Sequence, residues 1–202
     1  MENPDQADIL FQQGRFSDAI KLYTQELETN QKKKDEEESF IKNKRIGICF
    51  FKIDHFQEAH KYLNKALELA FNLSKVDTSY ISELIEIKIL MAEITAERGE
   101  YDRAMAKLDD INKIIESDQS LNAHLSAKLL YSYGTLHYRL GKYKKAAEYF
   151  EKGLEILEKN PIDCEEDFVD FNLSAGLVYT ILSEFPKALR YIETAFDFIL
   201  RK

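Results

Sequence analysis

Residues 133–153 read YGTLHYRLGKYKKAAEYFEKG, and this stretch decides the fold. Apolar and aromatic residues recur at helical spacing on both sides of Gly141, which interrupts the pattern. Helices often end at a glycine, because a residue there takes a positive φ and glycine has no Cβ to clash. The stretch therefore predicts two helices joined by a tight turn at Gly141.

The same pattern occurs five times along the chain, at intervals of 40 to 45 residues. Each copy has an alanine, an aromatic residue three positions before it and a large apolar residue four positions after it. The alanines are Ala19, Ala59, Ala104, Ala146 and Ala188, and the aromatic residues are Phe16, Phe56, Tyr101, Tyr143 and Phe185. A repeat of this length indicates stacked two-helix units, each of which buries its apolar face against its neighbour.

All seven glycines fall at fixed positions of the repeat. Three lie five residues before the alanine, where the first helix should end: Gly14, Gly99 and Gly141. Three lie twelve residues before it, inside the first helix: Gly47, Gly134 and Gly176. The seventh, Gly153, lies seven residues after its alanine, where other copies have Ala66 and Ala195. A glycine inside a helix costs about 1 kcal/mol relative to alanine, so we expect a neighbouring helix to pack closely there. We expect the recurring aromatic residue to fill each hairpin.

The composition fits an all-α protein and disfavours several classes of partner. Hydrophobic residues make up 45% of the chain and charged residues 32%, with only seven Gly and three Pro. An all-β fold would need many more turn residues and β-branched residues. The net charge of −8 disfavours binding to nucleic acid and to anionic membranes.

The cysteines and the lengths of the apolar runs indicate the cellular compartment of the protein. Cys49 and Cys164 are far apart in the sequence and form no disulfide framework, which is typical of a reducing environment. No apolar run approaches the length that spans a bilayer, and residues 1–8 are polar and acidic, unlike a leader peptide. We therefore predict a cytoplasmic protein without membrane insertion.

The repeat resembles the tetratricopeptide repeat (TPR) family. The resemblance rests in the fourth copy on a small residue, a turn glycine, an aromatic residue, an alanine and a second small residue, namely Gly134, Gly141, Tyr143, Ala146 and Gly153. The first copy departs most, with Glu26 where a small residue is usual. The period exceeds the 34 residues usual for the family, and such longer units resemble those of kinesin light chains and of bacterial peptide-sensing regulators.

The resemblance implies an all-α fold, a right-handed superhelix of five helix pairs with about ten antiparallel helices. It implies one domain over residues 1–202, with repeats at approximately 3–35, 36–77, 78–119, 120–162 and 163–202.

The sequence carries no motif typical of an enzyme. It has no phosphate-binding glycine loop, no HExxH and no paired cysteine cluster. His55 and His60 are five residues apart and so do not share a helix face as zinc ligands would, and His137 replaces a core aromatic residue of the family. We expect no catalytic residue, cofactor or metal. The carboxylate clamp of chaperone-binding relatives is incomplete, because Ile48 and Leu90 stand where its asparagines would be.

In TPR proteins the inner face of the first helices lines a groove for peptides or partner helices. The candidate groove residues are those on this face that the assigned core positions do not include. They are Lys44, Ile48, Phe51, Lys52, Lys128, Tyr131, Thr135, Tyr138, Arg139, Leu173 and Leu177. We favour Phe51, Tyr131 and Tyr138 as anchors because aromatic residues dominate interfaces. Packing against the neighbouring first helix is the alternative explanation for each of these residues.

These residues favour a non-catalytic scaffold that binds a peptide or helical segment of a partner protein in the concave groove. Two alternatives stay open: a peptide-sensing regulator, and a structural subunit that contacts a larger assembly through its edges. The C-terminal pattern crowds Phe196, Phe198, Ile199 and Leu200 together. We therefore also expect self-association through the C-terminal helix.

Overall fold

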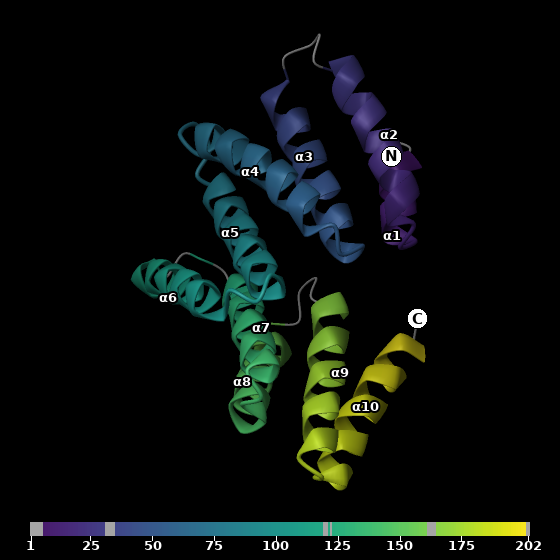
Figure 1. Cartoon of the computed structure of the whole chain (residues 1–202), viewed down its shortest axis with the longest axis vertical. Helices are drawn as coiled ribbons and strands as arrows, with labels where there is room; N and C mark the ends of the chain where they lie inside the picture. The colour runs from purple at the N-terminus through teal and green to yellow at the C-terminus, as the bar shows by residue number, and fades with distance from the viewer. Residues whose placement is uncertain (1–5, 31–34, 119–120, 122, 161–164, 201–202) are drawn as a thin grey trace. The chain divides into compact units, whose positions relative to one another are not determined.

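The computed structural model describes residues 6–30, 35–118, 121, 123–160 and 165–200, and in these ranges it contains ten α-helices and no strand (Figure 1). The helices are α1 Gln6–Gln12, α2 Phe16–Asn30, α3 Glu36–Lys52, α4 Phe56–Leu73, α5 Tyr80–Glu97, α6 Tyr101–Ser117, α7 Ala123–Arg139, α8 Tyr143–Lys159, α9 Glu165–Ile181 and α10 Phe185–Leu200. The predicted all-α architecture of about ten helices is confirmed. Cys164 lies outside the described residues.

The chain divides into two compact units, residues 1–98 with α1 to α5 and residues 99–202 with α6 to α10. In the first unit each helix packs against the next one in the chain. The second unit is built in the same way, and α7 also touches α9. The predicted single domain and its repeat boundaries stay predictions.

The first helix of a pair ends in a left-handed residue. Gly141 has a φ of 69°, the N–H of Lys142 donates to the carbonyl of His137 at 2.9 Å, and the N–H of Gly141 donates to that of Tyr138. These two bonds satisfy carbonyl groups that the end of the helix would leave without a partner. The positive φ recurs at Gly14 and Gly99, as the sequence predicts, and also at the equivalent residues of the other two copies, Asp54 (60°) and Ser183 (61°).

The glycines inside the helices mark close packing. A Cβ on Gly134 would lie 2.5 Å from the Phe150 ring, and one on Gly153 would lie 2.1 Å from the Phe171 ring. Gly47 and Gly176 are equally close to side chains of the following helix, Leu63 and Ile192. The prediction of a tight helix contact at the small position is confirmed.

Each unit has its own apolar core. In the first unit the core lies in two clusters, one around Tyr23 and Ile46 and the other around Leu63 and Ile87. In the second unit the core is centred on Phe150 and Phe171 and joins α7, α8, α9 and α10.

The recurring aromatic residues fill the hairpins only in part: Phe16, Phe56 and Tyr143 pack against the core clusters. Phe16, Phe56, Tyr101 and Tyr143 are only half-buried, and Phe185 is exposed. The aromatic ring sits at the turn end of its hairpin, so its burial depends on what lies beside that end. In three hairpins it contacts an aromatic residue of the preceding helix, in the pairs Phe11–Phe16, Phe51–Phe56 and Tyr138–Tyr143.

Candidate functional site

The predicted groove residues lie along one line of each first helix. Successive members are four residues apart, so they lie one above another on the helix surface. The line is Lys44, Ile48 and Lys52 in α3, Tyr131, Thr135 and Arg139 in α7, and Leu173 and Leu177 in α9, where Ile181 continues it one turn further. We call the last of these, Leu173, Leu177 and Ile181, the α9 stripe.

In the first unit two of the three residues on this line are lysines, and one of them is paired with carboxylates of the same chain. Lys44 of α3 forms ion pairs with Glu83 and Glu86 of α5, so its ammonium group is neutralised within the chain. Ile48 is half-buried, and Lys52 is exposed at the last residue of α3. The α3 line therefore offers a ligand little apolar surface.

Phe51 and Tyr138 brace their own hairpins. The two residues occupy equivalent positions, and each ring contacts the aromatic residue that begins the next helix, at centroid distances of 6.1 Å for Phe51–Phe56 and 5.7 Å for Tyr138–Tyr143. Both are half-buried. They have a packing role, and their role as anchors for a ligand stays a prediction.

The expectation that Tyr131 is spare once the core is filled is wrong. Its ring packs against Phe171 at 5.0 Å and against Phe150 at 5.6 Å, within the core of the second unit. Its hydroxyl group shares a hydrogen bond of 3.1 Å with Ser174 of α9. Tyr131 therefore joins α7 to α9.

The α9 stripe is an exposed apolar part of this face. Its three side chains are 41% to 49% exposed, although all are large and apolar. The hydrogen bond between Tyr131 and Ser174 places α7 next to α9. On α7, Thr135 and Lys128 are half-buried and Arg139 is exposed at the last residue of the helix. In the second unit, the apolar stripe of α9 therefore lies beside a helix that carries the polar residue Thr135 and the cations Lys128 and Arg139.

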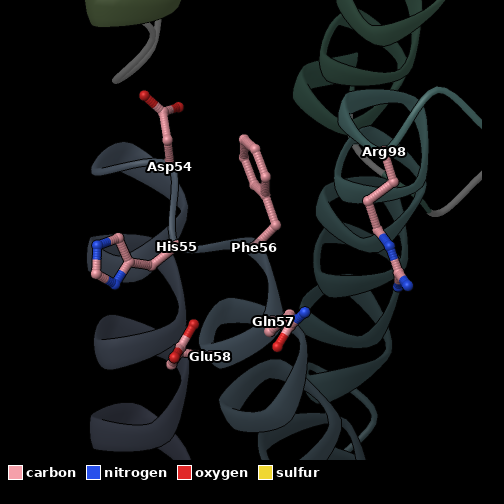
Figure 2. Close-up of a pocket in the computed structure, with 6 residues that line it drawn as sticks. All are labelled: Asp54, His55, Phe56, Gln57, Glu58 and Arg98. Atoms are coloured by element: carbon pink, nitrogen blue, oxygen red, sulfur yellow. The ribbon is translucent and has the colours of Figure 1, made fainter.

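One open hollow lies at the turn between α3 and α4. It has a volume of about 390 Å³ and is lined by Asp54, His55, Phe56, Gln57, Glu58 and Arg98. Figure 2 shows Asp54 and Phe56 projecting to the same side of the turn, whereas the His55 ring points away from Arg98. The His55 ring instead stacks on Phe50 at 6.0 Å. The Asp54 carboxylate and the His55 ring point in different directions (Figure 2), so the hollow does not pair these two groups for chemistry on a substrate.

The described residues offer neither a metal site nor a membrane-spanning helix. Among the residues that the structure describes, no three His, Cys, Asp or Glu side chains are grouped so that they could hold a metal ion. None of the helices in the described ranges is both long and apolar enough to cross a membrane.

Comparison with known families gives two matches to the tetratricopeptide repeat, over residues 6–37 and 83–159. Together they span more than half of the chain. The chain belongs to the TPR family.

Individual TPR proteins resemble it over different lengths. Heat shock protein STI1 of Saccharomyces cerevisiae is 30% identical over 125 residues, which is 59% of this chain and 19% of that protein. A crystal structure of Rap protein complexed with competence and sporulation factor matches with a TM-score of 0.80 and 19% identity, over 96% of this chain and 52% of that one. Bacillus thuringiensis PlcR in complex with the peptide PapR7 and DNA matches with a TM-score of 0.75 and 18% identity, over 96% and 68%. The chain therefore spans about a fifth of STI1 and about half of the Rap protein, and the structural likeness is one of fold.

His137 stands in this TPR chain where the family has an aromatic residue of the core. It is buried, it stacks on Tyr149 at 5.2 Å, and its Nδ1 atom has no hydrogen-bond partner among the described residues. Burial lowers the pKa of His137 below its ordinary value of 6.5, and the charges of Lys142 and Lys145 act in the same direction, against a smaller opposite effect of Glu148. Folding therefore favours the neutral form of this imidazole.

This environment predicts a pH-dependent loss of stability. Below pH 6.5 the unfolded chain binds a proton at His137 more readily than the folded chain does, so the free energy of unfolding falls as the pH falls. We expect His137→Phe, which keeps the stacked ring, to lose less stability than the wild type between pH 7.5 and pH 5.5 in urea titrations followed by circular dichroism. His55→Gln, at an exposed position, serves as the control and should follow the wild type. Equal losses for His137→Phe and the wild type would contradict this account.

Proposed function

We propose that this TPR chain is a non-catalytic scaffold that holds a peptide or helical segment of a partner protein against the first-helix face of its second unit. The face consists of the α9 stripe with Thr135 and Tyr138 of the neighbouring helix α7. The proposal places the protein in the cytoplasm, in keeping with its acidic composition and scarce cysteines.

The α9 stripe carries the proposal. Leu173, Leu177 and Ile181 are exposed one turn apart on a helix whose other apolar residues are buried or half-buried. Burying an exposed leucine side chain in an interface contributes about 1.5–3 kcal/mol. Three such residues in line therefore provide apolar contact for an extended or helical segment about two turns long.

Charge on the neighbouring helix suggests the nature of the segment. Arg139 ends the α7 line that runs beside the stripe, and Lys128 lies one turn before Tyr131, the first residue of that line. Both already interact within the chain, so they favour acidic groups through their electrostatic field rather than as free donors. We infer a ligand with apolar residues at helical or alternate spacing and a few acidic residues near its ends.

Two relatives give this proposal its context. PlcR, which shares the fold, was crystallised with the peptide PapR7, and the Rap protein with competence and sporulation factor. A peptide-sensing regulator would use the same face and would in addition change its conformation on binding. The scaffold function needs only the face itself, so it is the simpler proposal.

The test uses selected peptides. A phage-displayed library of random 12-residue peptides is panned against the immobilised chain, and enriched peptides are synthesised and titrated by isothermal calorimetry. We expect Leu177→Glu to weaken their binding at least about tenfold, because one apolar contact of 1.5 kcal/mol or more is lost. Leu177 is preferable to Tyr138 for this purpose, since the Tyr138 ring also packs against Tyr143.

The control is Phe71→Glu, which places the same charge at an exposed apolar position of α4 in the other unit. It should bind the selected peptides as the wild type does. Unchanged binding by Leu177→Glu, or a panning experiment that enriches no peptide, would refute the proposed site. Circular dichroism melts of all three proteins establish that each is folded.

A further inference from the structure

The helix α10 carries a second exposed apolar stripe, which the proposed function does not use. Five large apolar residues are 50% to 78% exposed along it: Phe185, Leu189, Phe196, Ile199 and Leu200. At about 100° per residue they fall within one face of the helix, together with the half-buried Ile192. The buried residues Ala188, Tyr191 and Ala195 form a different face, toward the core. We call the exposed set the α10 stripe.

The equivalent positions of the preceding hairpin are covered by a helix. Leu189, Phe196 and Ile199 lie 42 residues after Ala147, Leu154 and Leu157 of α8. Those three α8 residues are buried in the same apolar cluster as Phe171 of α9. The α10 stripe therefore repeats a surface that, one hairpin earlier, is buried in contact with the next helix. Helix α9 packs against both α8 and α10, and Figure 1 shows α9 and α10 side by side.

The order of apolar residues along α10 suits pairing with itself. Phe185 and Leu200 lie at equal distances from the point between Ile192 and Glu193, and so do Leu189 and Phe196. Two copies of α10 that run antiparallel about that point would place a large apolar residue opposite a large apolar residue at each of these positions. A twofold axis requires such self-complementarity of an interface.

Charged residues beside the α10 stripe are also ordered so that two antiparallel copies would bring opposite charges together. Arg190, Glu193 and Asp197 flank it on one side. A twofold axis perpendicular to two antiparallel helices brings the same flank of each copy together, with the sequence order reversed. Arg190 of one copy then lies between Glu193 and Asp197 of the other. Opposite charges therefore meet when the partner is a second, antiparallel copy of α10, so a second copy of the chain is an occupant that fits both the apolar and the charged positions.

We propose that the α10 stripe is a homodimer interface in which two α10 helices pack antiparallel about a twofold axis near Ile192. Phe198 is not part of it, because its ring packs inward against Phe168 at 5.3 Å. The interface is distinct from the α9 stripe, so peptide binding and dimerisation are separable.

Charge reversal tests the proposal directly. Sedimentation velocity is run over a hundredfold range of concentration on the wild type, on Arg190→Glu and on the double variant Glu193→Arg with Asp197→Arg. The wild type is expected to dimerise with rising concentration, and each variant alone to dissociate at least about tenfold more readily, because its flank repels itself. An equimolar mixture of the two variants is expected to form a 1:1 heterodimer, since one flank is then wholly acidic and the other wholly basic.

A second pair of variants addresses the stripe itself. Phe196→Glu should be monomeric, whereas Phe71→Glu, an equally exposed phenylalanine in the other unit, should dimerise as the wild type does. All these positions are exposed, and circular dichroism of each variant checks that it is folded. A wild type that stays monomeric at every concentration overturns the proposal. So does a dimer that neither charge variant weakens, or a pair of variants that does not associate on mixing.

Discussion

Replacing Phe171 by alanine is expected to lower the free energy of unfolding of the second unit by about 3–5 kcal/mol, the usual range for a buried phenylalanine. Phe171 is 1% exposed. Its ring contacts Tyr131 and Phe150, at centroid distances of 5.0 Å and 6.2 Å, and it lies over Gly153, where there is no side chain. Removal of the ring therefore leaves a cavity among three helices, α7, α8 and α9. Urea denaturation followed by circular dichroism measures the loss.

A matched substitution shows whether burial is the cause. Phe71→Ala removes the same atoms from an exposed position of α4, and we expect it to change the free energy of unfolding by no more than about 0.5 kcal/mol. If Phe171→Ala were no more destabilising than Phe71→Ala, the core of the second unit would not be centred where the structure places it.

The helical hairpins could be predicted from the sequence because their decisive features are local. A turn that needs positive φ selects glycine, and a close helix contact excludes a side chain, so Gly141 and Gly134 mark both features directly. The repeat also located the turn at Ser183, which has positive φ although it is not glycine. The residue type alone does not mark Ser183 as a turn residue, but its position in the repeat, five residues before Ala188, does.

Burial at the hairpin ends could not be predicted in the same way. The sequence gives Tyr143 and Phe185 the same place in the repeat, yet Tyr143 is half-buried against Tyr138 and Phe185 is exposed. The residue equivalent to Tyr138 in the fifth copy is Thr180, which has no ring to stack on. The pattern of one helix pair therefore fixes where an aromatic residue lies, and its neighbours decide how far it is buried.

The candidate site was only partly predictable for a related reason. Tyr131 and Lys44 lie on the expected line, but their partners Ser174 and Glu86 are more than 40 residues away in the sequence. Helical spacing identifies which residues share a face, and it does not say which of them contact the next repeat. Leu177 is exposed in the structure, and this exposure makes it the better probe of binding.

The buried lysine of the first unit was missed, although the sequence pointed to one of its partners. Lys42 of α3 has a side chain that is only 8% exposed, and its Nζ atom lies 2.6 Å from a carboxylate oxygen of Glu26 in α2 and 3.0 Å from one of Glu38. Burial favours the neutral amine, but the hydrogen bonds and charges of these two carboxylates outweigh it and raise the pKa of Lys42 above its ordinary value. Glu26, the departure from the TPR pattern in the first copy, is therefore the counter-ion of a buried cation.

This arrangement predicts an unusual order of stabilities. Glu26→Ala should lower the free energy of unfolding by about 2 kcal/mol, because it leaves Lys42 buried with a single, half-exposed carboxylate. Lys42→Met should lower it by less, no more than about 1 kcal/mol, because the two carboxylates that it leaves without their cation are 28% and 38% exposed and stay hydrated, so no buried charge loses its partner. The double variant should then be more stable than Glu26→Ala alone, because the charge that lacked its partner is gone. Urea titrations of the three variants measure the order, and a double variant less stable than Glu26→Ala would mean that Lys42 contributes through its packing rather than through its charge.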